Sequence, residues 1–222
     1  VRLARFAGAR IVMGRATGYC KGKSGTLHIS VAELGVVLTS TIVGGELSLA
    51  PGVALAQTLG AEGTEPGGIT VVFFGDGAAC EGIFHEAVNL AVTWQLPILF
   101  VCENNQWQAY VPRTQAMAVP HVADWVVGHG LDGRVVDGND VDAVHAQAHA
   151  LVEAVRADGR PRLLELQRAA QEALGLAATS FQALAKRMPE PYWIAEPDDI
   201  IARNMQLLRE SSNEPLAIDA CY

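Results

Sequence analysis

Three short apolar runs constrain the fold more than any other feature of the sequence. They are "ITVVFFG" (69–75), "PILFVCE" (97–103) and "PRLLELQ" (161–167). The first is rich in β-branched and aromatic residues and lacks polar alternation, which is typical of a strand buried on both faces of a parallel sheet, and the other two are interpreted as buried strands as well. Helical patterns at 81–95 and 139–159 separate the runs, and Asp140 is the predicted N-cap of the second helix. The alternation predicts a doubly wound, mostly parallel α/β sheet.

The rest of the chain carries weaker signals. Residues 1–35 are glycine-rich and irregular, and a helix is expected from about Ser48. Residues 104–120 are interpreted as a loop, followed by a short helix (121–130) and a short strand (134–138). After residue 167 the strand signal ends and two helices around a proline-rich break are expected. We therefore predict an α/β domain over 1–167 and a helical C-terminal segment over 168–222.

Composition narrows the function classes. The 222 residues carry a formal net charge of -8 and no basic run, which argues against nucleic acid as a partner. No apolar stretch reaches the roughly 18 residues that a membrane-spanning helix needs. The start, "VRLARFAGARIVMGR", has neither a signal-peptide pattern nor an initiator Met, so a processed or partial product is expected. The four cysteines form no CxxC pair, which favours a bacterial cytoplasmic or a mitochondrial matrix protein.

The first apolar run ends in Gly75-Asp76-Gly77, at the carboxyl end of a strand, where open α/β sheets bind ligands. One interpretation is a strand-to-helix turn in which Asp76 caps the helix. A second is a dinucleotide fingerprint, Gly75-x-Gly77-x-x-Cys80, with Glu103 as the ribose-binding acid. The second leaves Asp76 unpaired beside a pyrophosphate, and Cys80 stands where a smaller residue is expected.

A third interpretation uses the charge of Asp76. A carboxylate beside a diphosphate is stable if a divalent cation lies between them, and Mg²⁺ prefers such oxygen ligands. The next strand ends in "ENNQW", so Asn104 and Asn105 provide amides at the neighbouring strand end. The 26 residues between Gly77 and Asn104 are enough for one helix and one strand.

This pattern resembles the thiamine diphosphate signature, GDG followed by NN. The longer stretch "FFGDGAACEGIFHEAVNLAVTWQLPILFVCENNQW" is similar to the α subunit of the E1 component of 2-oxo acid dehydrogenases, of the pyruvate, acetoin or branched-chain type. Three further stretches match that family in order: "GYCKGKSGTLHIS", "IVGGELSLAPGVALA" and "RVVDGNDVDAV…GRPRLLELQ". The resemblance covers about residues 11–167 and implies the thiamine diphosphate-binding fold.

The resemblance also implies the roles of individual residues. Mg²⁺ would be bound by Asp76, the side chain of Asn105 and the backbone carbonyl of Trp107. The backbone at Gly77 and Ala78 would hold diphosphate oxygens. In two of the other matching stretches, the backbone of Thr41 and Val43 would contact the aminopyrimidine ring, and His28 would lie near the substrate.

The family's activity gives the expected function. The resemblance implies an enzyme that decarboxylates a 2-oxo acid oxidatively, or cleaves acetoin, using thiamine diphosphate as the electron sink. It implies an α2β2 assembly with an E1 β subunit, which supplies the glutamate that activates the cofactor. The acyl group would then pass to a lipoyl group on an E2 partner.

Two family motifs are not found in this sequence. Relatives carry a Tyr-Arg pair upstream of the glycine-rich loop, and Arg5 and Arg10 do not match it. Relatives also carry a His-rich loop after the last strand, whereas here Gln167 is followed by "RAAQEALGLAATSF". An E1 α-like subunit that binds cofactor or partner without turnover therefore remains an alternative, and a dinucleotide-dependent oxidoreductase is a second one.

Overall fold

The computed structural model describes residues 14–24, 27–61, 67–108 and 111–167. The described residues belong to two compact units, one ending at Thr41 and the other starting at Ile42. The predicted helical segment 168–222 lies outside the described residues. The elements are η1 (Ala32–Leu34), α2 (Gly45–Thr58), β1 (Thr70–Gly75), α3 (Asp76–Ala79), α4 (Gly82–Trp94), β2 (Ile98–Asn104), β3 (Trp107–Gln108), β4 (Val111–Pro112), α5 (Arg113–Ala116), α6 (Val122–Val127), β5 (Asp132–Asp137), α7 (Val141–Asp158) and β6 (Arg162–Gln167).

The N-terminal unit is built from turns, as its glycine content predicts. Val31 and Val36 form an isolated antiparallel bridge around η1. Gly35 closes this turn with a φ of 68°, a left-handed value that glycine adopts without strain. Further along, the side chain of Thr39 accepts a hydrogen bond from the backbone N–H of Ile29 at 2.8 Å.

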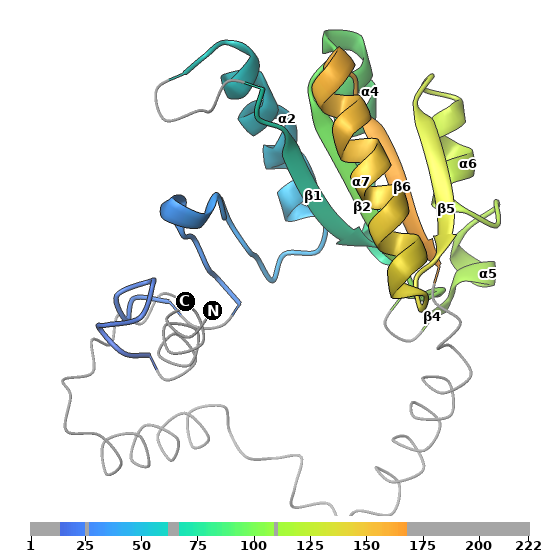
Figure 1. Ribbon diagram of the computed structural model, residues 1–222. Helices are drawn as coiled ribbons and strands as arrows, with labels where there is room; N and C mark the ends of the chain where they lie inside the picture. The colour runs from blue at the N-terminus through green and yellow to red at the C-terminus, as the bar shows by residue number, and fades with distance from the viewer. Residues whose placement is uncertain (1–13, 25–26, 62–66, 109–110, 168–222) are drawn as a thin grey trace, which may run out of the picture. The chain divides into compact units, whose positions relative to one another are not determined.

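The second unit contains a four-stranded parallel sheet in the order β1-β2-β6-β5 (Figure 1). β1 and β2 pair from Thr70↔Ile98 to Gly75↔Glu103, so the two strands end side by side. The three apolar runs form β1, β2 and β6 at the predicted places. The prediction of a parallel α/β sheet is confirmed.

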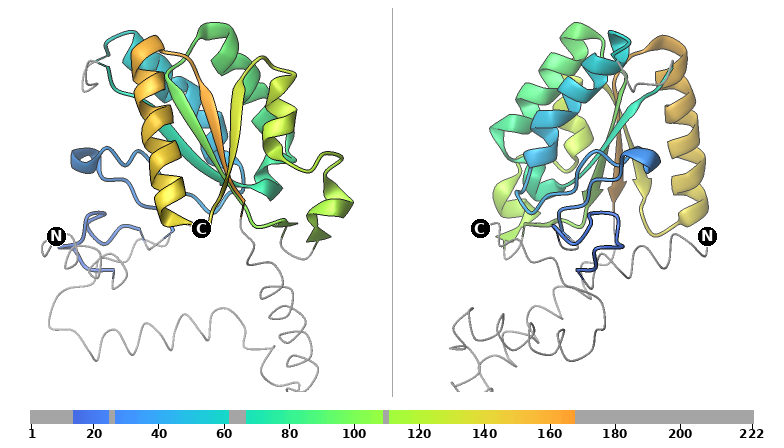
Figure 2. Two further views of the ribbon diagram at one scale, coloured as in Figure 1. Left: turned by 45° about the vertical axis from the view of Figure 1, so that its right-hand side comes forward. Right: turned by 90° about the vertical axis from the view of Figure 1, so that its left-hand side faces the viewer.

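Helices cover both faces of the sheet, with α2, α4 and α6 on one side and α7 on the other (Figure 2). The larger core lies on the first face, where the fully buried Phe84 of α4 packs against Phe74 of β1 with ring centroids 5.3 Å apart. The smaller core lies under α7 and contains four buried residues, Leu99, Val101, Leu151 and Leu164. The fold is therefore doubly wound, as predicted.

The prediction that β1 is buried on both faces is wrong. Thr70, Val72 and Phe74 are buried, but Val71 is 40% and Phe73 60% exposed. The cause is the strand order, because β1 is an edge strand and α7 packs on β6, β5 and β2. Within the part of the chain that the structure describes, no helix covers this side of β1.

Element boundaries differ from the sequence predictions in two places. α2 begins at Gly45 rather than near Ser48, directly after Gly44, whose φ of 71° makes the turn. The predicted loop at 104–120 contains a small antiparallel hairpin, β3–β4, followed by α5. The predicted cap of α7 is confirmed, since the Asp140 side chain accepts from the N–H groups of Asp142 and Ala143.

No described helix is long and apolar enough to cross a membrane.

Candidate functional site at the carboxyl edge of the sheet

Asp76 lies at the carboxyl edge of the sheet, where β1 ends. Gly75 leaves the strand in an extended conformation, and Asp76 begins the short helix α3. The Asp76 residue is only 1% exposed. Its carboxylate accepts hydrogen bonds from its own backbone N–H and from that of Asn105, whereas its Oδ2 atom is buried without a partner in the described structure. A buried carboxylate oxygen without a partner is costly, so this atom fits a ligand.

The electrostatics of Asp76 support the same conclusion. Burial raises the pKa of its carboxyl from 3.8 to about 6, and the nearby Glu165 carboxylate adds to the shift. The two backbone N–H donors and, to a smaller degree, the charge of Arg113 lower this pKa but do not cancel the effect of burial. A cation at Oδ2 would stabilise the charged form of Asp76.

The two asparagines at the end of β2 have different environments. Asn104 is fully buried, and its Nδ2 donates to Oε1 of Glu165 at 2.6 Å. Its Oδ1 accepts from the backbone N–H of Gln106 at 2.8 Å. Asn105 is half-buried, and its Oδ1 accepts from the N–H of Trp107 at 2.8 Å. An amide oxygen has two lone pairs, so Asn105 Oδ1 retains one for a ligand.

The hairpin β3–β4 presents the third candidate ligand. Gln106 has a φ of 63°, and its carbonyl accepts from the N–H of Arg113 at 2.7 Å. Trp107 faces Pro112 across the hairpin. Proline has no N–H, so it cannot donate to the Trp107 carbonyl oxygen. One carboxylate from the start of α3, one amide from the residue after β2 and one carbonyl from β3 thus form an oxygen set of the kind that Mg²⁺ prefers.

The structure places Gly77 next to the β3–β4 hairpin. A Cβ atom at Gly77 would lie 3.4 Å from Cγ of Gln108, which is ordinary van der Waals contact, so Gly77 of α3 lies directly against the β3–β4 hairpin. The side chain of Gln108 also donates from Nε2 to Sγ of Cys80 at 2.8 Å. The following Ala78 is 3% exposed. Contact of Gly77 and Ala78 with a diphosphate stays a prediction.

The remaining predicted residues belong to earlier parts of the chain. His28 and Thr41 belong to the N-terminal unit, and His28 Nε2 lies 3.5 Å from Thr41 Oγ1. Both side chains are exposed. Val43 lies in the turn before α2 and is 64% exposed. The roles assigned to these three residues from the family resemblance stay predictions.

Three residues that the sequence analysis did not select take part in the site. Glu165 on β6 is fully buried beside Asn104, and His121 Nδ1 lies 3.5 Å from its Oε1. Arg113 is half-buried and donates to the carbonyl of Val119 at 2.6 Å. The available signal was in "PRLLELQ", because a single acid inside a strand predicted to be buried requires partners.

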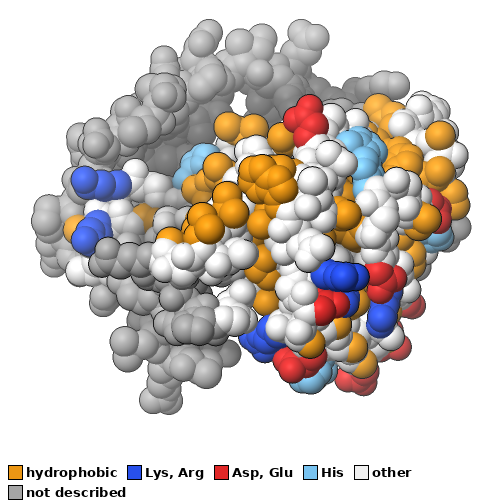
Figure 3. All heavy atoms as spheres, turned by 90° about the horizontal axis from the view of Figure 1, so that it is seen from above, with side chains coloured by type: hydrophobic (Ala, Val, Ile, Leu, Met, Phe, Trp, Pro, Cys, Tyr) orange, Lys and Arg blue, Asp and Glu red, His pale blue; other side chains and the backbone are white. Residues whose placement is uncertain are grey.

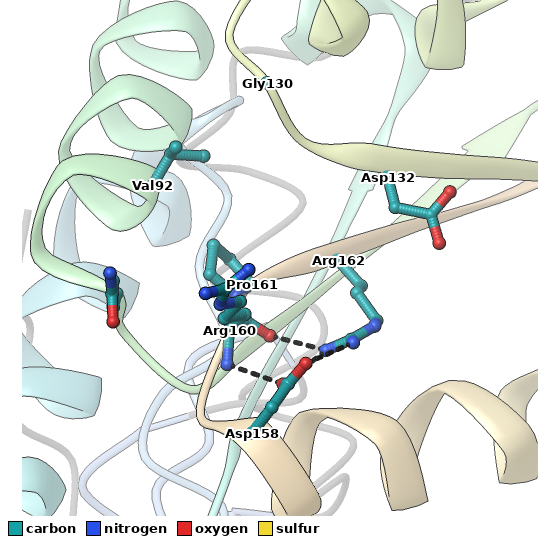
Figure 4. Close-up of a pocket in the computed structure, with 8 residues that line it drawn as sticks. Val92, Gly130, Asp132, Asp158, Arg160, Pro161 and Arg162 are labelled. Carbon is teal, nitrogen blue, oxygen red and sulfur yellow. Dashed lines mark hydrogen bonds and ion pairs between the residues drawn. The ribbon is translucent and has the colours of Figure 1, made fainter.

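A pocket of about 360 Å³ lies at the opposite, amino edge of the sheet (Figure 4). Acidic and basic side chains lie beside one another on this side of the molecule (Figure 3). Arg162, which lines the pocket, pairs with Asp158 at 2.7 Å. That contact satisfies both charges, and the pocket contains none of the predicted site residues. We therefore place the candidate site at the carboxyl edge.

The described residues contain no group of three or more His, Cys, Asp or Glu side chains that could hold a metal ion. The candidate ligand set differs from such a cluster because Asp76 is its single acid, and its other oxygens come from an amide and a backbone carbonyl. Sites of this mixed kind bind Mg²⁺ together with phosphate oxygens and water.

Comparison with known proteins agrees with the sequence resemblance. Residues 1–168 match the family model described as "Dehydrogenase E1 component". The α subunit of acetoin:2,6-dichlorophenolindophenol oxidoreductase from Bacillus subtilis (strain 168) is 41% identical over 154 residues, which are 69% of this chain and 45% of the relative. The α subunit of the pyruvate dehydrogenase E1 component from Porphyra purpurea is 35% identical over 163 residues, 69% of this chain and 46% of the relative.

The chain thus spans less than half the length of these two relatives. Among solved structures, transketolase from Leishmania mexicana matches with a TM-score of 0.54 and 23% identity, covering 75% of this chain and 26% of that chain. This similarity concerns the fold alone, and it agrees with the predicted thiamine diphosphate-binding type of α/β fold. The match to the family model covers most of the sequence, and the chain belongs to the dehydrogenase E1 component family.

Proposed function

We propose that this chain holds thiamine diphosphate and Mg²⁺ at the carboxyl edge of its sheet, as the α-type subunit of an E1 dehydrogenase. The observation that carries the proposal is Asp76, a carboxylate 1% exposed with a buried, unpartnered Oδ2. A buried charge of this kind needs a counter-charge. The charge of Arg113 is the smallest of the influences on the pKa of Asp76, and its guanidinium donates to the carbonyl of Val119. Arg113 therefore does not supply this counter-charge.

The chain's own residues would divide the work of binding. Asp76 Oδ2, Asn105 Oδ1 and the Trp107 carbonyl would hold the cation, with phosphate oxygens and water as its other ligands. The backbone of Gly77 and Ala78 would meet the diphosphate. In the preceding segments, the backbone of Thr41 and Val43 would meet the aminopyrimidine, and His28 would lie near the substrate.

The relatives suggest the reaction. They are named as acetoin oxidoreductase and pyruvate dehydrogenase α subunits, so a 2-oxo acid or acetoin is the proposed substrate. Bound thiamine diphosphate supplies the carbanion stabilisation that such carbon–carbon cleavage needs. An E1 β subunit in an α2β2 assembly and a lipoyl-bearing E2 are the proposed partners.

A second candidate is a subunit that binds cofactor and partner without turnover. The sequence after β6, "RAAQEALGLAATSF", favours it because the family's His-rich loop is not there and the last histidine is His149. The two candidates share the cation site and differ in catalysis. Turnover of pyruvate, branched-chain 2-oxo acids or acetoin with a co-expressed β subunit distinguishes them.

Calorimetry on the full chain tests the shared part of the proposal. We expect thiamine diphosphate to bind with Mg²⁺ present and not with EDTA. Asp76→Asn, which keeps the shape of the side chain, should abolish this Mg²⁺-dependent binding. Asp132→Asn is the matched control, because Asp132 is exposed at the amino edge and lies 3.7 Å from Arg134. Binding that is indifferent to Mg²⁺, with NAD bound instead of thiamine diphosphate, would show that the proposal is wrong and favour the dinucleotide alternative.

A further inference from the structure

Glu165 is an acid in the middle of the sheet whose side chain is completely buried. Its Oε1 accepts from Asn104 Nδ2 at 2.6 Å, and its Oε2 accepts from the N–H of Ala123 in α6 at 2.9 Å. His121 Nδ1 lies 3.5 Å from Oε1. None of these residues is among the candidate ligands, yet Asn104 is next to one of them. The contacts raise the question of what this buried charge does for the site.

The contact with Glu165 determines which way the Asn104 amide faces. A carboxylate only accepts hydrogen bonds, so the Asn104 amide must present its NH₂ group to Glu165. Its oxygen then faces the backbone N–H of Gln106, from which it accepts at 2.8 Å. If the amide turned over, the NH₂ group would meet the Gln106 N–H, donor against donor, and Glu165 would lose its partner.

The bond to Gln106 holds a backbone conformation that residues with side chains avoid. Gln106 has a φ of 63°, in the left-handed region, where its Cβ crowds the backbone. The Asn104 side chain accepts from the Gln106 N–H, and the Gln106 carbonyl accepts from the Arg113 N–H at 2.7 Å. These two hydrogen bonds hold Gln106 in place. A left-handed residue persists when its surroundings impose it. Since Gln106 stands between Asn105 and Trp107, its conformation determines where the oxygens of both point.

We propose that Glu165 is a positioning residue for the cation site. By orienting the Asn104 amide it keeps Gln106 left-handed, and thereby directs Asn105 Oδ1 and the Trp107 carbonyl toward Asp76. This inference rests on the proposed function for the identity of the ligand. The arrangement of Glu165, Asn104 and Gln106 is independent of that function and can be measured without cofactor.

The principal variant is Glu165→Gln, which keeps the size of the side chain. Its NH₂ group must face either the Asn104 NH₂ or the Ala123 N–H, so one of the two contacts is lost. Glu153→Gln is the matched control, because it removes the same charge from the exposed outer side of α7, where Glu153 pairs with Arg156. Asn104→Ala interrupts the relay and leaves the bond between Glu165 and Ala123 intact.

The first measurement is Mg²⁺ affinity of the full chain with saturating thiamine diphosphate, by calorimetry. Residues that orient metal ligands affect affinity about 10- to 100-fold, and we expect a loss in this range for Glu165→Gln and for Asn104→Ala. The double variant should bind within about 2-fold of the weaker single variant, because both changes interrupt one relay. The Glu153→Gln control should bind like the unmodified chain.

The second measurement is amide hydrogen exchange in the chain without cofactor. We expect the Gln106 and Trp107 amides to exchange at least about 10-fold faster in Glu165→Gln, while Leu163 and Leu164 in β6 are unchanged. A purely structural role would accelerate the β6 amides together with the loop, and that result would overturn the inference. Unchanged Mg²⁺ affinity with unchanged loop exchange in both Glu165→Gln and Asn104→Ala would also overturn it.

The two measurements separate failure of the inference from failure of the proposed function. If the unmodified chain does not bind thiamine diphosphate with Mg²⁺, the proposed function is wrong, and the exchange experiment alone decides the role of Glu165. If Glu165→Gln does not fold, Asn104→Ala gives both readouts with the Ala123 contact in place.

Discussion

Replacing Asp76 with asparagine should stabilise the cofactor-free chain at neutral pH. Burial raises the pKa of this carboxyl from 3.8 to about 6, a difference of about 2 units. Each unit corresponds to about 1.4 kcal/mol, so the ionised carboxylate costs the folded state about 3 kcal/mol. The substituted asparagine would keep an oxygen that can accept from the Asn105 N–H, and it would carry no charge. Under the proposed function, this is stability that the chain gives up for ligand binding.

The sign of the pH dependence follows from the direction of the pKa shift. Between about pH 4 and pH 6 the folded chain holds the Asp76 proton while the unfolded chain releases it. The free energy of unfolding therefore falls as the pH rises through this range, and the loss is complete above it. Asp76→Asn lacks this contribution, so the two proteins should be equally stable near pH 4 and differ by up to about 3 kcal/mol at pH 7.5.

Urea unfolding with EDTA at pH 4, 5.5 and 7.5 measures this difference, with Asp132→Asn as the control for removing an exposed acid. Adding Mg²⁺ and thiamine diphosphate at 100 times their dissociation constant should then raise the stability of the unmodified chain by about 2.7 kcal/mol and leave Asp76→Asn unchanged. If Asp76→Asn is the less stable protein at pH 7.5 without cofactor, the carboxylate is not penalised by burial and the reasoning fails.

Four further substitutions test the packing and capping of the sheet and its helices. Phe84→Ala should cost about 3–5 kcal/mol in urea unfolding because Phe84 is fully buried against Phe74, whereas Phe73→Ala, at a side chain 60% exposed, should cost less than about 1 kcal/mol. Asp140→Ala should cost about 1 kcal/mol by removing the cap of α7, measured in the same way. Gly133→Ala should cost about 1–3 kcal/mol, because the new Cβ would lie 3.0 Å from Val126 Cγ2 and 3.1 Å from Ala123 Cβ. Unchanged stability would show that α6 can move away from β5 at little cost.

Elements with a periodic or continuous hydrophobic pattern could be predicted from the sequence because the pattern indicates which side chains face the core. The helix over 81–95 is observed as α4, and the apolar run at 97–103 is the central strand β2, buried on both faces. The run at 69–75 has the same pattern and a different outcome, with Phe73 exposed. Hydrophobicity predicts a strand, but strand order decides whether both its faces are covered, and order is a long-range property.

The candidate site shows the same limit in finer detail. The spacing of Asp76 and Asn105 indicated a shared sheet edge, and the parallel register, which pairs Gly75 with Glu103, brings their strand ends together. The spacing did not reveal that Asn104 turns inward or that Gly77 lies against Gln108. Both facts depend on a hairpin and on a strand 61 residues further along the chain.

The register of β6 explains why support for the site comes from so far away in the sequence. Cys102 pairs with Glu165, so both side chains lie on the same face of the sheet, and Asn104, two residues further along β2, is the diagonal neighbour of Glu165. A shift of β6 by one residue would turn Glu165 to the face under α7 and place the apolar Leu164 or Leu166 beside Asn104. The Asn104 amide would then lose its acceptor, and the left-handed Gln106 would lose the group that holds it. The pairing of β2 with β6 therefore specifies the geometry of the candidate site as directly as the residues that would touch the cation.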